Sequence, residues 1–158
     1  MLRMTKQADY GIVLLSHMAN APERRYAAPE LATEMQLPLP KVIKILKILS
    51  RSGVLDSHRG VKGGYSLANE PRDLSVAKLI SVLDGPIAIT ECVDDTPGQC
   101  SQEAVCHIRG NWQRINTAVR DALEAISLAD LAQPTSERLV QLTIGGQDLA
   151  SETPRSSI

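Results

Sequence analysis

Residues 39–53, LPKVIKILKILSRSG, form the stretch that decides the fold of this chain. Successive residues of an α-helix are turned by about 100°, and on such a helix the apolar and basic side chains of this stretch fall in two separate arcs. The apolar arc contains Val42, Ile45, Leu46 and Leu49, and the basic arc contains Lys41, Lys44, Lys47 and Arg51. Pro40 suits the first turn, and Gly53 suits the position just past the end. We therefore expect one amphipathic helix from about Leu39 to Ser52.

The segments around this helix predict a winged helix-turn-helix. Helical periodicity indicates a helix over residues 4–19 and a second, short helix that begins at Pro29. After the basic helix, residues 54–69, VLDSHRGVKGGYSLAN, form two strand-like runs around a glycine turn, and residues 75–83 predict a further helix. The predicted fold class is mainly α with a small β-wing, a winged helix-turn-helix followed by a long C-terminal dimerisation helix.

Residues 108–132 supply that last helix, because their apolar residues recur at alternating steps of four and three. The resulting seam contains Ile108, Trp112, Ile115, Val119, Ala122, Ile126 and Ala129. A helix of this length would measure about 37 Å, which is too long for a small domain to cover. We expect residues 108–132 to pack on their copy in a homodimer.

The charges of the chain are segregated, although its net charge is only −1. Six Lys or Arg face a single acid between Lys41 and Lys62, whereas five acids and no Lys or Arg lie between Asp84 and His107. A basic helix in the second position of a helix-turn-helix can enter the major groove of DNA, and a following glycine hairpin can contact the adjacent backbone. We expect double-stranded DNA to contact Lys41, Lys44, Lys47, Arg51, Arg59 and Lys62, with Gly63 and Gly64 permitting the tight turn.

The three cysteines of the chain, Cys92, Cys100 and Cys106, all lie in the acidic stretch. Their spacing does not match the paired knuckles of structural zinc, and acidic surroundings do not lower the pKa of a catalytic thiol. A disulfide would leave one thiol over. Three soft ligands within fifteen residues suit an iron–sulfur cluster, which needs a fourth ligand, and the alternative is three unrelated buried cysteines.

The first 21 residues resemble an export signal, but the uninterrupted apolar run from Gly11 to Leu15 is shorter than the roughly 7–15 residues of an export core. The chain also has no apolar stretch of about 20 residues that would span a membrane. We therefore expect a cytoplasmic protein without a membrane partner, in a compartment where thiols stay reduced.

Four stretches resemble the Rrf2 family of winged-helix transcriptional regulators: MLRMTKQADYGIVLL at the start, HRGVKGGYSLA in the hairpin, DGPIAITEC before the cysteines, and RGNWQRIN after them. The resemblance covers residues 1–132 and, within the family, is strongest to members that control the SUF genes for iron–sulfur assembly. It implies a homodimeric transcription factor whose cluster, expected to be 2Fe–2S, is held by Cys92, Cys100 and Cys106 and changes DNA binding with iron–sulfur supply.

The fourth ligand that the resemblance implies has two candidates. Relatives that control the housekeeping assembly pathway have a His three residues after the last Cys, where this chain has Arg109. His107 directly follows Cys106, and adjacent residues on a helix point about 100° apart. Nitric-oxide-sensing relatives use an acidic residue in the first helix of the partner subunit, and Asp9 matches that position.

The predicted organisation is a winged helix-turn-helix DNA-binding domain in residues 1–84, a cluster-binding loop in 85–107, a dimerisation helix in 108–132 and a poorly ordered tail in 133–158. No phosphate loop, catalytic triad or flavin motif is found, so we do not expect an enzyme. The alternatives are the same scaffold sensing nitric oxide or a small metabolite, a thiol enzyme, and an interaction module that dimerises without binding DNA. The operator, the direction of regulation and the DNA-binding form stay open.

Overall fold

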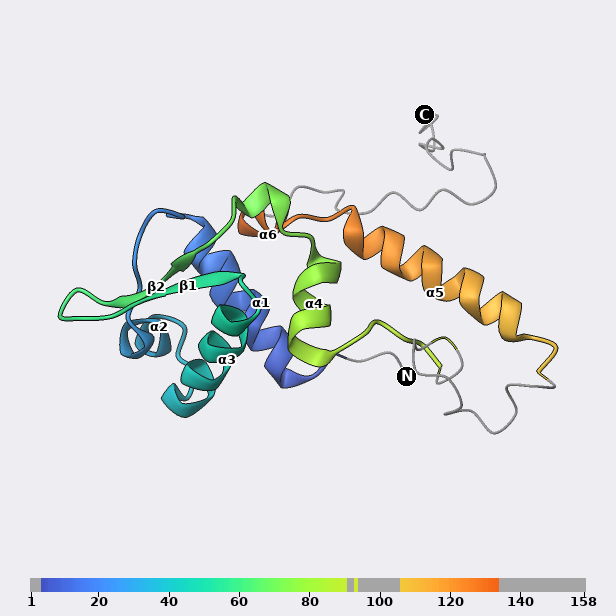
Figure 1. Cartoon of the computed structure of the whole chain (residues 1–158), viewed down its shortest axis with the longest axis horizontal. Helices are drawn as coiled ribbons and strands as arrows, with labels where there is room; N and C mark the ends of the chain where they lie inside the picture. Colours follow the sequence, from blue (N-terminus) through green and yellow to red (C-terminus); the bar gives the residue numbers. More distant parts are fainter. Residues whose placement is uncertain (1–3, 91–92, 94–105, 134–158) are drawn as a thin grey trace, which may run out of the picture.

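The computed structural model describes residues 4–90, 93 and 106–133. These residues form mostly helices, with one two-stranded antiparallel sheet (Figure 1). The elements are α1 (Lys6–Ala19), α2 (Ala28–Glu34), α3 (Leu39–Arg51), β1 (Leu55–His58), β2 (Gly64–Leu67), a 3-10 turn η1 (Pro71–Asp73), α4 (Val76–Asp84), α5 (Arg109–Glu124) and α6 (Leu128–Ala132). The predicted fold class, a winged helix-turn-helix with a C-terminal helix, is confirmed. The tail expected over residues 133–158 lies outside the described residues except for Gln133.

Helix α3 forms as its amphipathic pattern predicts. Its four predicted apolar residues are at most 2% exposed, and Gly53 beyond its end adopts φ 74°, a left-handed conformation that favours glycine. The turn before it begins at Gln36, which also has a positive φ, and the amide of Leu37 donates back to the carbonyl of Ala32 (2.9 Å). These local features set the direction in which α3 leaves α2.

The wing is a short hairpin whose register pairs Leu55 with Leu67 and His58 with Gly64. It is fastened to the segment before α2, because Tyr26 and Tyr65 exchange backbone hydrogen bonds of 2.8 and 2.9 Å. A side chain at Gly64 would lie 2.7 Å from the carbonyl oxygen of Tyr26, so this close approach requires glycine. The wing therefore has a defined position relative to α2 and α3.

One hydrophobic core joins the N-terminal elements to the last helix. Leucines from α1, α3, α4 and α6 are fully buried together, including Leu14, Leu46, Leu79 and Leu128. Burying a leucine side chain stabilises a fold by about 1.5–3 kcal/mol, so Leu128 makes α6 part of the winged domain. No helix among the described residues is long and apolar enough to cross a membrane.

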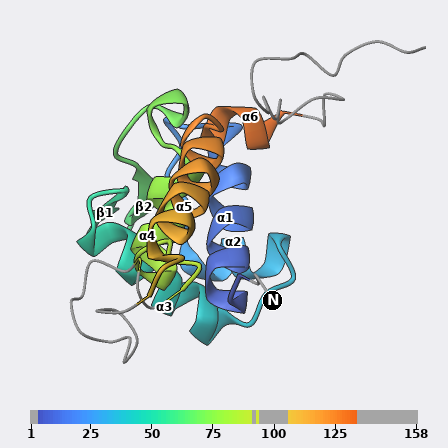
Figure 2. The ribbon, with the colours of Figure 1, turned by 90° about the vertical axis from the view of Figure 1, so that its right-hand side faces the viewer.

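The single helix predicted over residues 108–132 is wrong at its C-terminal end. Helix α5 stops at Glu124, and a new helix begins at Leu128, where Ser127 and Asp130 form a capping box. The chain between them pairs with the segment before α4: Val76 donates to the carbonyl of Ile126, and Leu128 donates to that of Leu74 (both 2.8 Å). Burial of Leu128 and this pairing outweigh continuation of the helix. Figure 1 shows α5 extending away from the winged domain, and in Figure 2, turned by 90°, α5 lies in front of that domain. Helix α6 returns to the winged domain, where it contacts α1 and η1.

Candidate nucleic-acid interface and cysteine segment

The basic face of α3 is exposed along its length. Its four predicted cations, Lys41, Lys44, Lys47 and Arg51, are all exposed, while the opposite face is buried against α1 and the wing. Their ammonium and guanidinium groups can neutralise phosphates, and they lie on the side of α3 that faces away from the core. The arrangement suits insertion of α3 into a groove of DNA.

The wing tip carries the other two predicted cations. Arg59 and Lys62 are exposed in the loop between β1 and β2, and Val61 between them is also fully exposed. The amide of Gly63 donates to the carbonyl of Gly60 (2.9 Å), which closes the turn. A side chain at Gly63 would lie 2.5 Å from the carbonyl of His58, so the predicted need for glycine here has a steric cause.

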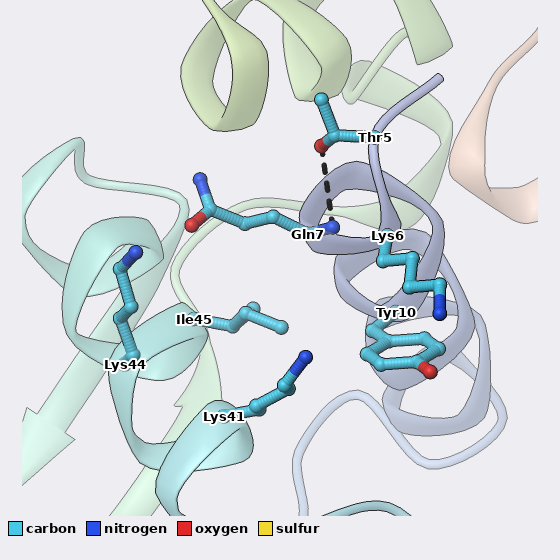
Figure 3. A pocket seen from close by; sticks show the side chains of 7 residues that line it. All are labelled: Thr5, Lys6, Gln7, Tyr10, Lys41, Lys44 and Ile45. Atoms are coloured by element: carbon cyan, nitrogen blue, oxygen red, sulfur yellow. Dashed lines mark hydrogen bonds between the residues drawn. The ribbon is translucent and has the colours of Figure 1, made fainter. Parts of the chain in front are cut away.

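A hollow of about 340 Å³ separates the N-terminal turn of α1 from α3 (Figure 3). It is lined by Thr5, Lys6, Gln7, Tyr10, Lys41, Lys44 and Ile45. The ammonium of Lys41 lies 5.9 Å from the centre of the Tyr10 ring, within the range of a cation–π contact. Lys41 and Lys44 were expected from the sequence to contact DNA. The lining from α1 was not expected, although Lys6 and Tyr10 are four residues apart and so share a helix face.

The end of α4 is joined to the start of α1. The amide of Thr5 (3.1 Å) and its hydroxyl both donate to the carboxylate of Asp84, and the side-chain amide of Gln7 donates to the carbonyl of Leu83 (2.6 Å). Thr5 also caps α1, accepting from the amides of Gln7 and Ala8. This joint, which no sequence signal indicated, links the chain that leads to the cysteines with a wall of the hollow.

The segment that follows α4 is held by one side chain of α5. Asn116 is only 6% exposed; its Oδ1 accepts from the amide of Ile89 (3.1 Å) and its Nδ2 donates to the carbonyl of Ile87 (3.0 Å). Asn116 thus pairs with two backbone groups as a neighbouring strand would. It was also missed, because an Asn inside a helical pattern carries no information about a distant partner.

The predicted cluster ligands are only partly described. Cys106 is a half-buried free thiol just before α5, His107 beside it is exposed, and Asp9 is exposed on α1. Cys92 and Cys100 lie outside the described residues. Within residues 4–90, 93 and 106–133, no three His, Cys, Asp or Glu side chains converge as a metal site would require.

Comparisons with known proteins agree with this geometry. The model of the Rrf2 family, described as an iron-dependent transcriptional regulator, matches residues 4–134. An rrf2-like HTH-type regulator of Rhodobacter capsulatus is 31% identical over 136 residues, which cover 81% of this chain and 91% of that protein. The HTH-type transcriptional repressor NsrR of Streptomyces coelicolor is 29% identical over 145 residues, covering 90% and 97%.

Solved structures show the same similarity. CymR, the global cysteine regulator of B. subtilis, superposes with a TM-score of 0.65 at 27% identity and covers 84% of this chain and 97% of its own. IscR of T. potens gives a TM-score of 0.62 at 26% identity, covering 82% and 85%.

Proposed function

Because this chain belongs to the Rrf2 family of DNA-binding transcriptional regulators, we propose that it controls iron–sulfur assembly genes of the SUF system according to the state of a cluster bound by its own cysteines. The family consists of regulators, and the chain is not an enzyme. The observation that carries the proposal is the position of the cysteine stretch. It connects α4, which is joined to the DNA-binding elements, with α5, which lies outside them.

Three of the proposed ligands are the thiolates of Cys92, Cys100 and Cys106. The fourth is either His107 of the same chain or Asp9 of the partner subunit. The donor set suits the group, because Cys106 is a half-buried thiol just before α5 and soft sulfur ligands select iron–sulfur clusters. When bound, a 2Fe–2S cluster would supply an inorganic core sensitive to iron supply and to oxidants. A carboxylate or imidazole binds more weakly than thiolate, which suits a cluster that is to be lost.

A chain of contacts supports coupling between this stretch and DNA. Asn116 of α5 holds residues 87–89, these follow directly on α4, and Asp84 at the end of α4 holds Thr5 at the start of α1. Binding of a cluster by Cys92, soon after this segment, and Cys106, just before α5, would favour one position of α5 relative to α1. Coupling free energies of this kind are commonly about 1–3 kcal/mol.

The exposed apolar face of α5 supports a homodimer. Ile108 and Ile115 are 39% and 47% exposed, and a shallow hollow beside Ile115 is lined by Asn111, Arg114 and Ala118. Apolar side chains repeated along one helix face are stabilised by burial against a second copy. Two recognition helices in such a dimer would meet half-sites about 34–36 Å apart.

The deciding experiment compares the apo protein with the reconstituted protein on its own upstream DNA. We expect protein purified without oxygen to absorb between about 400 and 500 nm, as iron–sulfur clusters do, and the two forms to differ in mobility-shift affinity. A variant with serine at Cys92, Cys100 and Cys106 should behave as the apo form under both conditions. A colourless protein without iron or sulfide, or a cysteine-free variant that still regulates normally when iron is withheld, contradicts the proposal.

A second candidate is the same scaffold with another signal. The similarity to CymR, a cysteine regulator, favours a small sulfur metabolite, and the similarity to NsrR makes nitric oxide the other test ligand. Each has its own readout. Fast, selective bleaching of the cluster by nitric oxide supports the gas, and a change in DNA affinity with a metabolite in a cluster-free protein supports the metabolite.

A further inference from the structure

We propose that the hollow between α1 and α3 binds the sugar–phosphate backbone of DNA beside the groove that α3 enters, so that Lys6 and Tyr10 belong to the DNA interface. The proposal rests on α3 as the recognition helix. It adds a second contact surface, built from the N-terminal turn of α1, to the basic face of α3 and the wing.

The lining of the hollow matches the chemistry of that ligand. The buried side of its lining, its floor, is apolar and consists of the half-buried Tyr10 ring and the buried side chain of Ile45, and its exposed side, its rim, consists of Lys6, Lys41 and Lys44. Figure 3 shows Tyr10 of α1 facing Ile45 and Lys41 of α3. A deoxyribose ring offers C–H surface to the floor while the phosphates on either side of it meet the rim. The volume of the hollow, about 340 Å³, is ample for one sugar and one phosphate.

Among the residues that the structure describes, those lining the hollow are basic or uncharged. None of its lining residues is Asp or Glu, and within the described part of the chain no ion pair engages Lys6, Lys41 or Lys44. Asp84, which contacts the lining residue Thr5, is already engaged by both of that residue's donors. Three ammonium groups around one cavity repel each other, and a phosphate placed between them would offset that repulsion.

Continuity selects DNA rather than a small free anion as the occupant. Lys41 and Lys44 belong both to the rim of the hollow and to the exposed basic face of α3, so a duplex lying on that face passes directly over the hollow. Backbone contacts of this kind fix the position of a protein on DNA without specifying sequence. The hollow would thus determine how α3 enters the groove.

The test compares Lys6→Gln with Arg72→Gln, a matched loss of one positive charge on η1. The Arg72 side chain is 77% exposed and lies outside the hollow. Affinity falls as salt concentration rises, and loss of one phosphate contact should make the plot of log affinity against log salt concentration less steep by about 0.9. At 0.15 M salt this corresponds to roughly fivefold weaker binding. We expect this for Lys6→Gln on both operator and unrelated DNA, and no change for Arg72→Gln. Equal behaviour of the two variants overturns the proposal.

A second arm identifies the atom that is bound. A methylphosphonate replaces one charged phosphate by a neutral group, and it can be placed at each backbone position of the operator in turn. At one position we expect the parent to bind more weakly than to the unmodified operator, whereas Lys6→Gln should bind the modified and the unmodified operator equally. If no position shows this, the hollow does not contact the backbone. Inorganic phosphate is the control for a free anion: if at millimolar concentration it shifts the NMR signals of the hollow and does not compete with DNA, the occupant is an anion unrelated to DNA.

Failure of this proposal can be told from failure of the DNA interface as a whole. Lys44→Glu and Arg59→Glu test the interface on α3 and the wing. If both bind like the parent, that interface is misassigned. If both lose DNA while Lys6→Gln keeps the parent affinity and salt slope, only the hollow is misassigned.

Discussion

Asp84, the last residue of α4, accepts hydrogen bonds from both the amide and the hydroxyl of Thr5, the N-cap of α1. The two residues are 79 positions apart, so this contact is made by folding alone. A carboxylate at the N-terminus of a helix is also favoured by the helix dipole. The joint therefore holds together the start of the DNA-binding domain and the chain that leads to the cysteines.

Thr5→Ala should lower the free energy of unfolding by about 1–2 kcal/mol, because it removes an N-cap. Asp84→Ala should lower it by less, and the two effects should not add, since both variants break the same contact. Urea denaturation of the double-mutant cycle measures this. Thr117→Ala on the exposed face of α5 is the control, and purely additive losses would show that the contact contributes nothing of its own.

Gly11→Ala should be less stable than the matched variant Gly110→Ala by about 1–3 kcal/mol, because overpacking against Leu83 offsets the gain in helix propensity that both share. A Cβ at Gly11 would lie 2.5 Å from Cδ1 of Leu83, because α1 and α4 approach closely at this point. Gly110→Ala in α5 is the matched control: nothing lies within 4 Å of a Cβ there, so the substitution should be neutral or slightly stabilising. Equal melting temperatures for the two variants would contradict this packing.

Asn116→Leu should free residues 87–89 from α5. It keeps the number and branching of the side-chain heavy atoms but leaves the Ile89 amide and the Ile87 carbonyl without this partner, at a cost of about 1–3 kcal/mol. Hydrogen exchange should show faster exchange of the Ile89 amide in Asn116→Leu than in Gln113→Leu, an exposed position on the same helix. Under the proposed function the variant should also lose its cluster sooner. Unchanged exchange at Ile89 would exclude the role of Asn116.

The capping box of α6 should make stability depend on acid pH. Hydrogen bonds from the Ser127 side chain and then from its backbone amide lower the pKa of Asp130 below its ordinary value of 3.8. The ionised Asp130 carboxylate therefore contributes its full stabilisation above the ordinary pKa of 3.8, and this contribution is lost as the pH falls through the lower pKa of the folded state. Between about pH 5 and pH 2, Asp130→Asn should lose less stability than the parent in denaturation experiments. Parallel curves would rule out this contribution.

Ile115→Glu should convert the proposed dimer to a monomer, because it places a charge on the exposed apolar face of α5. Thr117→Glu adds the same charge about 200° around the helix and should leave the dimer intact. Sedimentation velocity at micromolar concentration distinguishes the two. If the Ile115→Glu variant remains dimeric, the dimer interface lies on a surface other than this face of α5.

The elements of the winged domain were predictable because their signals are local. The separate apolar and basic arcs of α3 and the glycines of the wing depend on neighbours within a few residues. Helices α1, α2, α3 and α4 begin within one or two residues of their expected positions. The error at residues 125–127 has the opposite cause. The heptad pattern continues through Ile126, but Leu128 gains more by burial in a core made of residues distant in sequence.

The same division holds for the candidate site. The cations of α3 and the wing could be assigned from the sequence, since a helix face follows from spacing. Thr5, Gln7, Asp84 and Asn116 could not, since each acts through a partner 27 to 79 positions away. Local spacing along the chain was enough to specify α1 to α4, the basic face and the three clustered thiols. The joints between α1, α4 and α5 and the return of α6 depend instead on which distant surfaces the core brings together.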